Sequence, residues 1–458
     1  MKLILSILII ISLLDDSDYH PTTYVFPAFK HTMGIRKAGA TELFLFMGFR
    51  VKFRNPEGIV CVRLDSWEDP EDPHDDDELT VYGVNSGQNN IIYNTSMWGI
   101  DVFSIDEDEG RPLKNPHGIC ANSRGDVYIA DTGNDRVVRL FNPAHQLEYI
   151  SQIGSNGEQD GYFNSPRQVA VDNFGNLFVS DSANNRIQVF DSTDSFKYSF
   201  SGNGYLSGPN GIMVTDSIEK ASKFKDNFLI VVDSLDQRIN KFDLKGNLIS
   251  TLSMPQIGFG KSKLEYVAID YHNQVLITDS KNHCIHKFDR NLNYIISFGR
   301  KGDDDFEFLE PKGITIYRHF GQLFVAESSG AQYYWVGTDI IDLKYKIDKG
   351  EIIFAFKITE PSYLTVDIFD SNDKFVMRLM QRRLLANAGV HNLKWNGFVS
   401  KTNQRILDEN DFELSERVKA GDRAPSGLYK VKFSLEATYS SRTYFIRSEE
   451  TEIEYSYK

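Results

Sequence analysis

A short pattern recurs along most of this chain at a spacing of about fifty residues. Each copy starts with Pro-x-Gly-Ile or a variant, continues through an apolar strand that ends in Asp, and then has Asn-x-Arg before a further strand. The clearest copies are NPHGICANSRGDVYIADTGNDRVVRLF (115–141) and SPRQVAVDNFGNLFVSDSANNRIQVF (165–190). Several strands per unit at this period are typical of a β-propeller. The pattern therefore predicts the fold and leaves the activity open, because one fold hosts many functions.

The residue that ends the second strand of each unit aligns the copies. These residues are Asp131, Asp181, Asp233, Asp279 and Glu327, at intervals of 50, 52, 46 and 48 residues. A weaker copy, VYGVNSGQNNI (81–91), matches VYIADTGNDRV (127–137) without a gap and puts Asn85 in the Asp position. The spacing thus predicts six units over about residues 30–345.

The fixed residues of the unit are expected to build its corners. Strands such as LFVSD (177–181) are almost continuously apolar, as expected when neighbouring blades cover both sheet faces. The Asp that follows can accept N–H groups of the next turn, where Thr132-Gly133-Asn134 or Ala183-Asn184-Asn185 tolerates positive φ, and the next Arg can tie the corner together. A residue repeated in every unit is predicted to be structural rather than catalytic. The predicted corner residues are Asp131, Arg136, Asp181, Arg186, Asp233, Arg238 and Asp279.

These units resemble NHL repeats, and the resemblance implies a six-bladed NHL β-propeller. Three departures stand out: an insertion in the fourth unit (217–227), Leu264-Glu265-Tyr266 in place of Pro-x-Gly in the fifth, and the loss of the Arg in the sixth. The upstream segment TELFLFMGFRVKF (41–53) reads as a strand. We expect it to close the ring against the last blade, which would protect an exposed sheet edge.

The period stops after residue 350, and the rest reads as a second all-β domain over 350–458. Its strands resemble the small Ig-like sandwich of flagellar hook-capping proteins, which is also found at the C-terminus of many exported bacterial proteins. The matching positions are Ile368, Asp370, Gly389, Trp395, Gly397, Pro425, Gly427 and Tyr429, whereas the loop 405–423 is unlike the family. The resemblance implies a role in secretion or cell-surface attachment, with a plain structural cap as the alternative.

The first fourteen residues, MKLILSILIIISLL, combine one Lys with an apolar run the size of a signal-peptide core. We therefore expect an exported protein that is secreted, periplasmic or at the cell surface; a short membrane anchor is the alternative. Cys61, Cys120 and Cys284 are too few for a disulfide framework and are expected to pack in the core.

The net charge of −14 argues against nucleic acid as a partner, because phosphate-binding surfaces need clustered Lys and Arg. RNA binding, which occurs in some animal NHL proteins, conflicts with this charge and with export.

The variable residue of Pro-x-Gly lies at the start of each inner strand and is predicted to line the mouth of the central channel. Around the ring these residues are Glu57, His117, Arg167, Asn210, Glu265 and Lys312. Convergent polar groups are typical of binding sites, although any solvent-facing turn is also polar. We expect a non-catalytic protein whose ring binds a protein, peptide or glycan.

The alternative is a lyase or hydrolase at the channel mouth, using His117 with Arg167 and Glu57 or Glu265. The amidating lyase of peptide-hormone processing resembles NHL propellers and holds zinc with three histidines, but this ring supplies one. The remaining His145, His272, His283, His286 and His319 are predicted in loops, a hairpin or an outer strand, so no metal or other cofactor is expected. The acidic loop 65–78 carries nine carboxylates and could bind Ca²⁺, but its spacing matches no EF-hand. A solvated loop is the simpler interpretation. The same interpretation applies to the acidic residues at 106–109 and 303–305.

Overall fold

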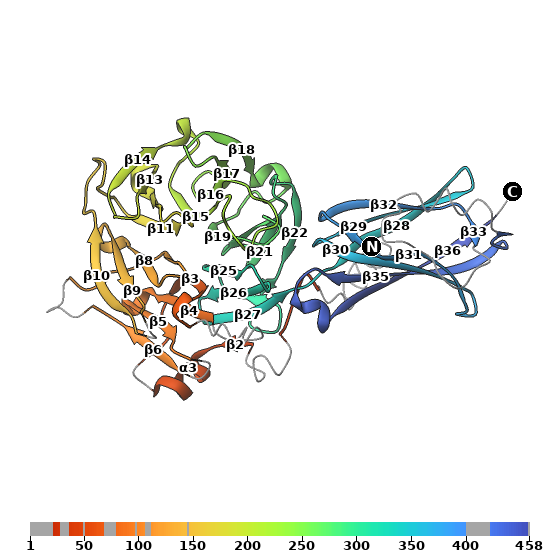
Figure 1. Cartoon of the computed structure of the whole chain (residues 1–458), viewed down its shortest axis with the longest axis horizontal. Helices are drawn as coiled ribbons and strands as arrows, with labels where there is room; N and C mark the ends of the chain where they lie inside the picture. The colour runs from red at the N-terminus through yellow and green to blue at the C-terminus, as the bar shows by residue number, and fades with distance from the viewer. Residues whose placement is uncertain are drawn as a thin grey trace, which may run out of the picture.

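The computed structural model describes residues 22–27, 36–48, 51–67, 79–96, 99–105, 111–143, 146–399 and 422–456. This part of the chain is all-β, apart from one helix, α3 (Ala40–Met47), and short 3₁₀ turns. Figure 1 shows small sheets gathered around a centre and, beside them, an elongated pair of sheets. No helix among the described residues is long and apolar enough to cross a membrane.

Five of the small sheets consist of four antiparallel strands each, in chain order. Their strands are β3 (Pro56–Arg63), β4 (Leu79–Asn85), β5 (Asn90–Asn94) and β6 (Ile100–Phe103); β7 (Ile119–Ala121), β8 (Asp126–Asp131), β9 (Arg136–Phe141) and β10 (Glu148–Ile153); β11 (Pro166–Val171), β12 (Leu177–Asp181), β13 (Arg186–Phe190) and β14 (Phe196–Phe200); β15 (Pro209–Thr215), β16 (Phe228–Asp233), β17 (Arg238–Phe242) and β18 (Leu248–Ser253); β19 (Leu264–Ile269), β20 (Val275–Asp279), β21 (Cys284–Phe288) and β22 (Tyr294–Phe298). Four-stranded antiparallel sheets of this kind are the blades of a propeller.

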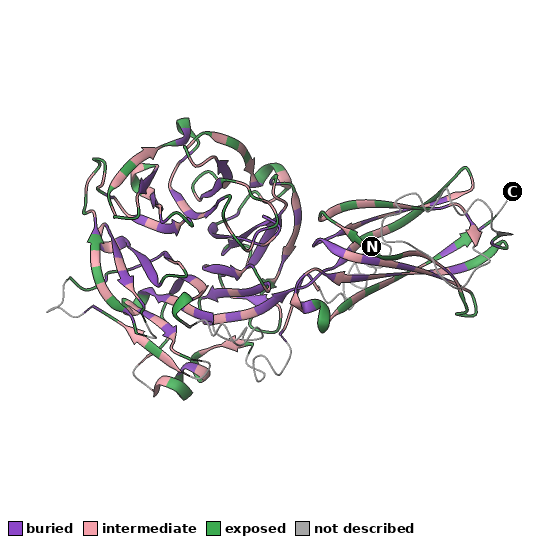
Figure 2. Ribbon diagram, in the orientation of Figure 1, coloured by how far each residue is buried: buried purple, intermediate pink, exposed green. Residues whose placement is uncertain are grey.

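The second strand of each of these sheets is almost wholly buried, as its apolar sequence predicts. β8, β12, β16 and β20 are buried along their whole length, and their side chains pack into clusters shared with the next sheet. Figure 2 shows the buried residues concentrated on the inner strands. Cys120 and Cys284 are buried, Cys61 is partly buried, and all three are free thiols.

The sheet of the last repeat is completed by strands from the N-terminal part of the chain. β25 (Ile314–Tyr317), β26 (Gln322–Glu327) and β27 (Gly330–Val336) pair in order, and β27 then pairs with both β1 (Tyr24–Val25) and β2 (Lys37–Ala38). A two-stranded parallel pair, β23 (Arg300–Lys301) with β24 (Glu307–Phe308), precedes this sheet.

The prediction that residues 41–53 form a closing strand is wrong, because residues 40–47 form α3. The backbone N–H of Gly39 donates to the Glu42 carboxylate (2.9 Å), which caps the first turn of the helix. Leu43 alone is buried, whereas Leu45 is 74% exposed. The apolar run therefore lies along a surface helix, and the earlier segments β1 and β2 complete the sheet of the last repeat.

The remaining strands form two facing sheets around a core of their own. One sheet has the order β28 (Ile340–Asp348), β29 (Glu351–Ile358) and β32 (Gly389–Trp395). The other has the order β31 (Phe375–Leu385), β30 (Ser362–Asp370), β35 (Gly427–Ala437) and β36 (Ile446–Tyr455), and a short pair joins β33 (Phe398–Val399) to β34 (Asp422–Arg423). Since β28 begins at Ile340 and pairs with β29, this unit starts earlier than residue 350.

Several positions singled out in this C-terminal region occupy its core and turns. The Trp395 indole is buried against Tyr429 and donates to the Phe398 carbonyl (3.1 Å). The Tyr429 hydroxyl donates to the Pro425 carbonyl (2.7 Å), and the Asp370 carboxylate accepts two N–H groups of the turn that follows. These residues stabilise the two sheets rather than form a site.

The C-terminal unit packs directly against the last two sheets of the ring. The Tyr439 hydroxyl accepts from the Tyr271 N–H (3.1 Å), and its ring belongs to the apolar cluster of the last sheet. Lys287 and Glu360 form an ion pair that is buried on both sides. Separating the two parts or removing either partner would leave a buried charge without its counter-ion. The ion pair therefore favours this one packing of the C-terminal unit against the sheets.

Candidate functional site

One hydrogen bond recurs at the corner of every repeat. The side chain that ends the second strand accepts a backbone N–H from the segment before the variable residue. The donor lies two positions before the Pro in five repeats and one position before Leu264, the counterpart of Pro, in the fifth. The pairs are Arg54 to Asn85 (2.7 Å), Lys114 to Asp131 (2.7 Å), Asn164 to Asp181 (2.8 Å), Ser207 to Asp233 (2.7 Å), Lys263 to Asp279 (3.0 Å) and Leu309 to Glu327 (2.7 Å). The expectation that the Asp serves the following turn was incomplete. Its shared role is to hold the start of the inner strand.

The cation that completes the corner differs between repeats. Arg136 and Arg186 each donate from Nε to the corner Asp at 2.7 Å, as the repeat predicts. Arg238 departs from this, because it pairs with the exposed Asp236, and burial then raises the pKa of Asp233 to about 6. In the fifth repeat Cys284 stands at the Arg position, and His286, two residues further along β21, contacts Asp279 instead, with Nε2 3.1 Å from the carboxylate.

The sixth corner takes its cation from the other end of the chain. Glu327 has no following Arg, and the ammonium of Lys37 on β2 lies 3.1 Å from its carboxylate. Gln332 adds a side-chain hydrogen bond at 3.0 Å. The strand that completes this sheet therefore also supplies the missing charge.

The glycine of Pro-x-Gly is required by close approach between neighbouring sheets. The Gly58 N–H donates to the His117 carbonyl (2.9 Å), and the Gly313 N–H donates to the Glu57 carbonyl (3.0 Å). A Cβ at these glycines would lie 2.7 Å and 2.3 Å from the same oxygens. The second contact joins the sheet of β25–β27 to that of β3–β6, the last repeat to the first. Gly133 has a similar role against the Lys114 carbonyl, whereas the positive φ of its turn falls at Asp135.

Hydroxyl groups beside the corner Asp tie four of the six variable segments to the preceding sheet. Thr132 donates to the Pro166 carbonyl (2.6 Å), Ser180 to that of Asn210 (2.9 Å), Ser234 to that of Leu264 (2.7 Å) and Thr278 to that of Lys312 (2.6 Å). This motif is not among the features predicted from the sequence. Its signal is the Ser or Thr next to each Asp in ADT, VSD, VDS and ITD.

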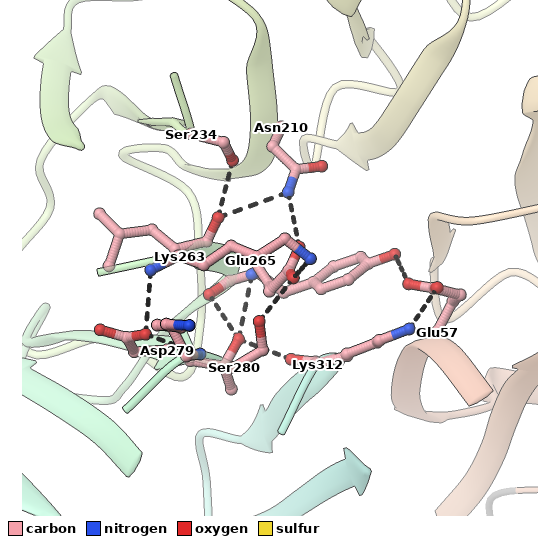
Figure 3. A network of polar contacts seen from close by, with 12 residues as sticks. Glu57, Asn210, Ser234, Lys263, Glu265, Asp279, Ser280 and Lys312 are labelled. Carbon is pink, nitrogen blue, oxygen red and sulfur yellow. Dashed lines mark hydrogen bonds and ion pairs between the residues drawn. The ribbon is translucent and has the colours of Figure 1, made fainter. Parts of the chain in front are cut away.

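Four of the six variable residues form two carboxylate-centred groups, and Figure 3 shows them in one view. Lys312 Nζ lies 2.7 Å from Glu57 Oε1, and Asn55 donates to the same oxygen at 3.0 Å. Glu265 accepts from Asn210 (3.0 Å) and from Ser280 (2.8 Å), and the Lys263 ammonium lies 2.5 Å away. Residues far apart in the sequence thus share one polar region.

Tyr266 links the two groups. It stands where other repeats have the glycine of Pro-x-Gly, and its hydroxyl donates to Glu57 Oε2 across 209 residues of sequence (3.3 Å). Burial, with the charge of Glu57 next, holds the pKa of this hydroxyl well above its usual range. The apparent defect in the fifth repeat therefore places a proton donor on the central network.

His117 is nearly buried and neutral at ordinary pH. Its Nδ1 lies 3.0 Å from the Asn115 carbonyl, which identifies Nδ1 as the protonated nitrogen. Its Nε2 lies 4.0 Å from Glu57 Oε1, too far for a hydrogen bond. Burial and then the charge of Arg167 lower the pKa of His117 to about 4. The Nε2 lone pair is consequently available as an acceptor.

Arg167 is the sixth variable residue and differs from the others. Its backbone carbonyl faces Gly118, the residue after His117, where a Cβ would lie 2.6 Å from that oxygen, and its charge lowers the pKa of His117. Within the part of the chain that the structure describes, its guanidinium has no hydrogen-bond or ion-pair partner. The residue is half-buried, and neither its nitrogens nor His117 Nε2 are buried atoms without a partner, so both groups contact solvent.

The other predicted sites contribute little to this region. Residues 1–14, 68–78 and 106–109 lie outside the described residues, so the calcium site remains a prediction. Asp303 and Asp305 pair with Lys37 and Arg36. No group of three or more His, Cys, Asp or Glu side chains among the described residues is arranged to hold a metal ion.

Comparison with known proteins agrees with the repeat pattern. The family model described as the NHL repeat matches residues 113–140 and 163–190. The chain carries NHL repeats. The human NHL repeat-containing protein 3 is 35% identical over 77 residues, which are 17% of this chain and 22% of that protein.

Two further relatives match longer segments at lower identity. The Drosophila melanogaster protein brain tumor is 29% identical over 136 residues, 29% of this chain and 12% of that protein. A probable peptidyl-alpha-hydroxyglycine alpha-amidating lyase of Caenorhabditis elegans is 27% identical over 142 residues, 30% of this chain and 39% of that protein. The chain therefore spans well under half the length of these curated relatives.

Solved structures show only a loose likeness. Virginiamycin B lyase from Staphylococcus aureus has a TM-score of 0.42 at 16% identity, over 57% of this chain and 77% of that one. A gluconolactonase from Xanthomonas campestris has a TM-score of 0.43 at 12% identity, over 70% of this chain and 96% of that one. Similarity at this level supports no conclusion about activity.

Proposed function

We propose that this chain is a binding protein whose NHL repeats form a closed, six-bladed ring, and that the variable residues at the inner-strand starts bind a protein, peptide or glycan. The hydrogen bond from Gly313 to Glu57, between the last repeat and the first, supports ring closure. The fold itself commonly serves protein interaction, which fits a binding role.

One observation carries the proposal: equivalent positions of different repeats meet in one polar network. Lys312 contacts Glu57, Asn210 contacts Glu265, and Arg167 acts electrostatically on His117. Structural corners close within their own repeat, apart from the sixth, whereas these residues face one another across repeats. A convergent set of polar groups with unused hydrogen-bonding capacity is the usual composition of a binding site.

The test is a binding screen of the full chain against peptide and glycan arrays, repeated with Lys312→Met and Asn210→Ala. Lys245→Met, on an exposed turn, is the control of matched chemistry. We expect ligands found with the native chain to lose about tenfold or more in affinity in the ring variants and to bind the control unchanged. Ligands that bind all four proteins equally would place the binding surface elsewhere and contradict the proposal.

A lyase or hydrolase at the same ring is the second candidate, favoured by the neutral His117 with its free Nε2 beside Arg167 and Glu57. A histidine that keeps an available lone pair can act as a general base. If the chain turns over a lactone or peptide-derived substrate, His117→Gln should abolish the turnover while His319→Gln, at an exposed position, should not. Elemental analysis of the active protein would show whether a metal takes part.

We also propose that the C-terminal sheets form an Ig-like module used for attachment or secretion, and that the protein is exported. The positions of Trp395, Tyr429 and Pro425 in one core and its turns support the module. The leader-like sequence 1–14 supports export. Cell fractionation with N-terminal sequencing tests the second point; full-length protein confined to the cell interior would refute it.

A further inference from the structure

The charges of the central network can be paired off one by one. Glu57 is matched by Lys312 at 2.7 Å and Glu265 by Lys263 at 2.5 Å. Asn210 and Tyr266 complete these carboxylates as neutral donors. Both negative charges at the ring positions are therefore compensated by lysine.

After this pairing, the positive charge of Arg167 is the one charge at the variable positions that has no counter-ion among the described residues. Arg167 has no carboxylate partner among the described residues, and its neighbour His117 is neutral with a free Nε2. The chain as a whole carries a net charge of −14, so a local surplus of positive charge is contrary to its general electrostatics. An unpaired guanidinium beside an unpaired acceptor is a complementary surface for a ligand that brings both an anion and a donor.

Resting on the proposed ring function, we infer that Arg167 anchors a carboxylate group of the ligand and that His117 Nε2 accepts a hydrogen bond from an N–H or O–H next to it. The planar guanidinium offers two parallel N–H donors that match a carboxylate in geometry. A single guanidinium compensates one negative charge. A phosphate dianion would bring a second charge next to Glu57, so a singly charged carboxylate fits better.

Two pairs of small probes test this inference on the full chain. Galacturonate is compared with galactose, and N-acetylglycine with N-acetylglycinamide, so that each carboxylate has a neutral counterpart. The readout is the NMR signal of the His117 ring during titration, together with affinity by calorimetry. A response to galacturonate alone identifies a uronic acid as the source of the carboxylate, and a response to N-acetylglycine alone identifies a peptide carboxyl group.

Arg167→Met and Arg167→Lys are the diagnostic variants, and Arg300→Met, whose side chain is 81% exposed, is the control for net charge. We expect carboxylate affinity to fall about tenfold to a hundredfold in Arg167→Met, less in Arg167→Lys, and not in Arg300→Met. Thermal unfolding verifies that each variant is folded.

Two results overturn the inference in different ways. Neutral probes that bind as tightly as the carboxylates, with no effect of Arg167→Met but a loss in Lys312→Met, would leave the ring as a binding site and remove the carboxylate. Probes and array ligands that never perturb the His117 signals would remove the proposed ring function as well.

Discussion

The sheet of strands β11–β14 contains two arginines that differ in their hydrogen bonding. Arg186 begins β13 and has several partners: it donates from Nε to the buried Asp181 (2.7 Å) and from Nη2 to the carbonyls of Gln159 and Tyr162. Arg167, near the start of β11, has no such partner among the described residues. The first position is Arg in the second, third and fourth repeats, whereas the second position holds five different residue types across the six repeats. The contrast is between a fixed residue whose hydrogen bonds hold the fold together and a variable residue, Arg167, whose donors are available to the proposed ligand.

The largest effect is expected at the corner. Asp181→Ala removes an acceptor of the Asn164 N–H and leaves Arg186 and Gln188 without their shared partner. Losing one member of a buried pair costs about 3–5 kcal/mol of unfolding free energy. Urea unfolding measures this, with Arg167→Met as the comparison, for which we expect a change within about 0.5 kcal/mol. Equal losses in the two variants would erase the distinction between corner and ring.

A smaller effect should appear in the pH dependence of stability and be specific to the ring. The pKa of His117 is lowered from 6.5 to about 4 in the folded state. The unfolded chain then binds more protons between these values, so this residue leaves stability intact above pH 6.5 and reduces it as the pH falls toward 4. Between pH 7.5 and 4.5, we expect the unfolding free energy of His117→Gln to fall by about 2 kcal/mol less than that of the native chain.

His319→Gln, at an exposed position, is the control and should follow the native chain at both pH values.

NMR titration adds a sharper comparison. Arg167→Met should raise the pKa of His117, because the guanidinium charge is one cause of its depression. Arg186→Met should leave it unchanged. A His117 that titrates at its ordinary value in the native chain would show that the ring is open to water and not the semi-buried network described.

The smallest effect is expected at the corner of the sixth repeat, where Lys37 from β2 supplies the cation for Glu327. Lys37→Met leaves Glu327 with the Leu309 N–H and Gln332 but without its charge partner. The ion pair is partly exposed, so we expect a loss of about 1 kcal/mol, measured by urea unfolding. Lys301→Met on the neighbouring exposed strand should change stability by less. A Lys37 variant as stable as this control would mean that the sixth repeat does not need the cation.

The sequence was most informative where the fold repeats itself. The interval between corner residues predicted the four-stranded sheets. This feature follows from local periodicity, which one chain displays several times over. Among the variable positions, the structure brings Lys312 to Glu57 and Asn210 to Glu265.

Contacts between distant segments were not predictable in this way. Lys37 replaces a missing Arg only because β2 pairs with β27, and Tyr266 reaches Glu57 only because the first and fifth repeats lie near each other in the ring. The apolar run 41–53 has the composition of a strand, but residues 40–47 form a helix that presents Leu45 to solvent. The hydroxyl beside each corner Asp was visible in the sequence, but its partner, a carbonyl of the next sheet, was not.

The most direct test is a two-way comparison of Arg167→Met and Arg186→Met, since both remove an arginine from the same sheet. For each variant, the unfolding free energy is measured by urea titration, and the affinity for the carboxylate probe that binds best is measured by calorimetry. We predict that Arg167→Met keeps its stability and loses binding, whereas Arg186→Met loses about 2–3 kcal/mol of stability and, while folded, keeps binding. If Arg167→Met is the less stable variant, or if folded Arg186→Met loses the same affinity, the division between structural corners and a ligand-binding ring is contradicted.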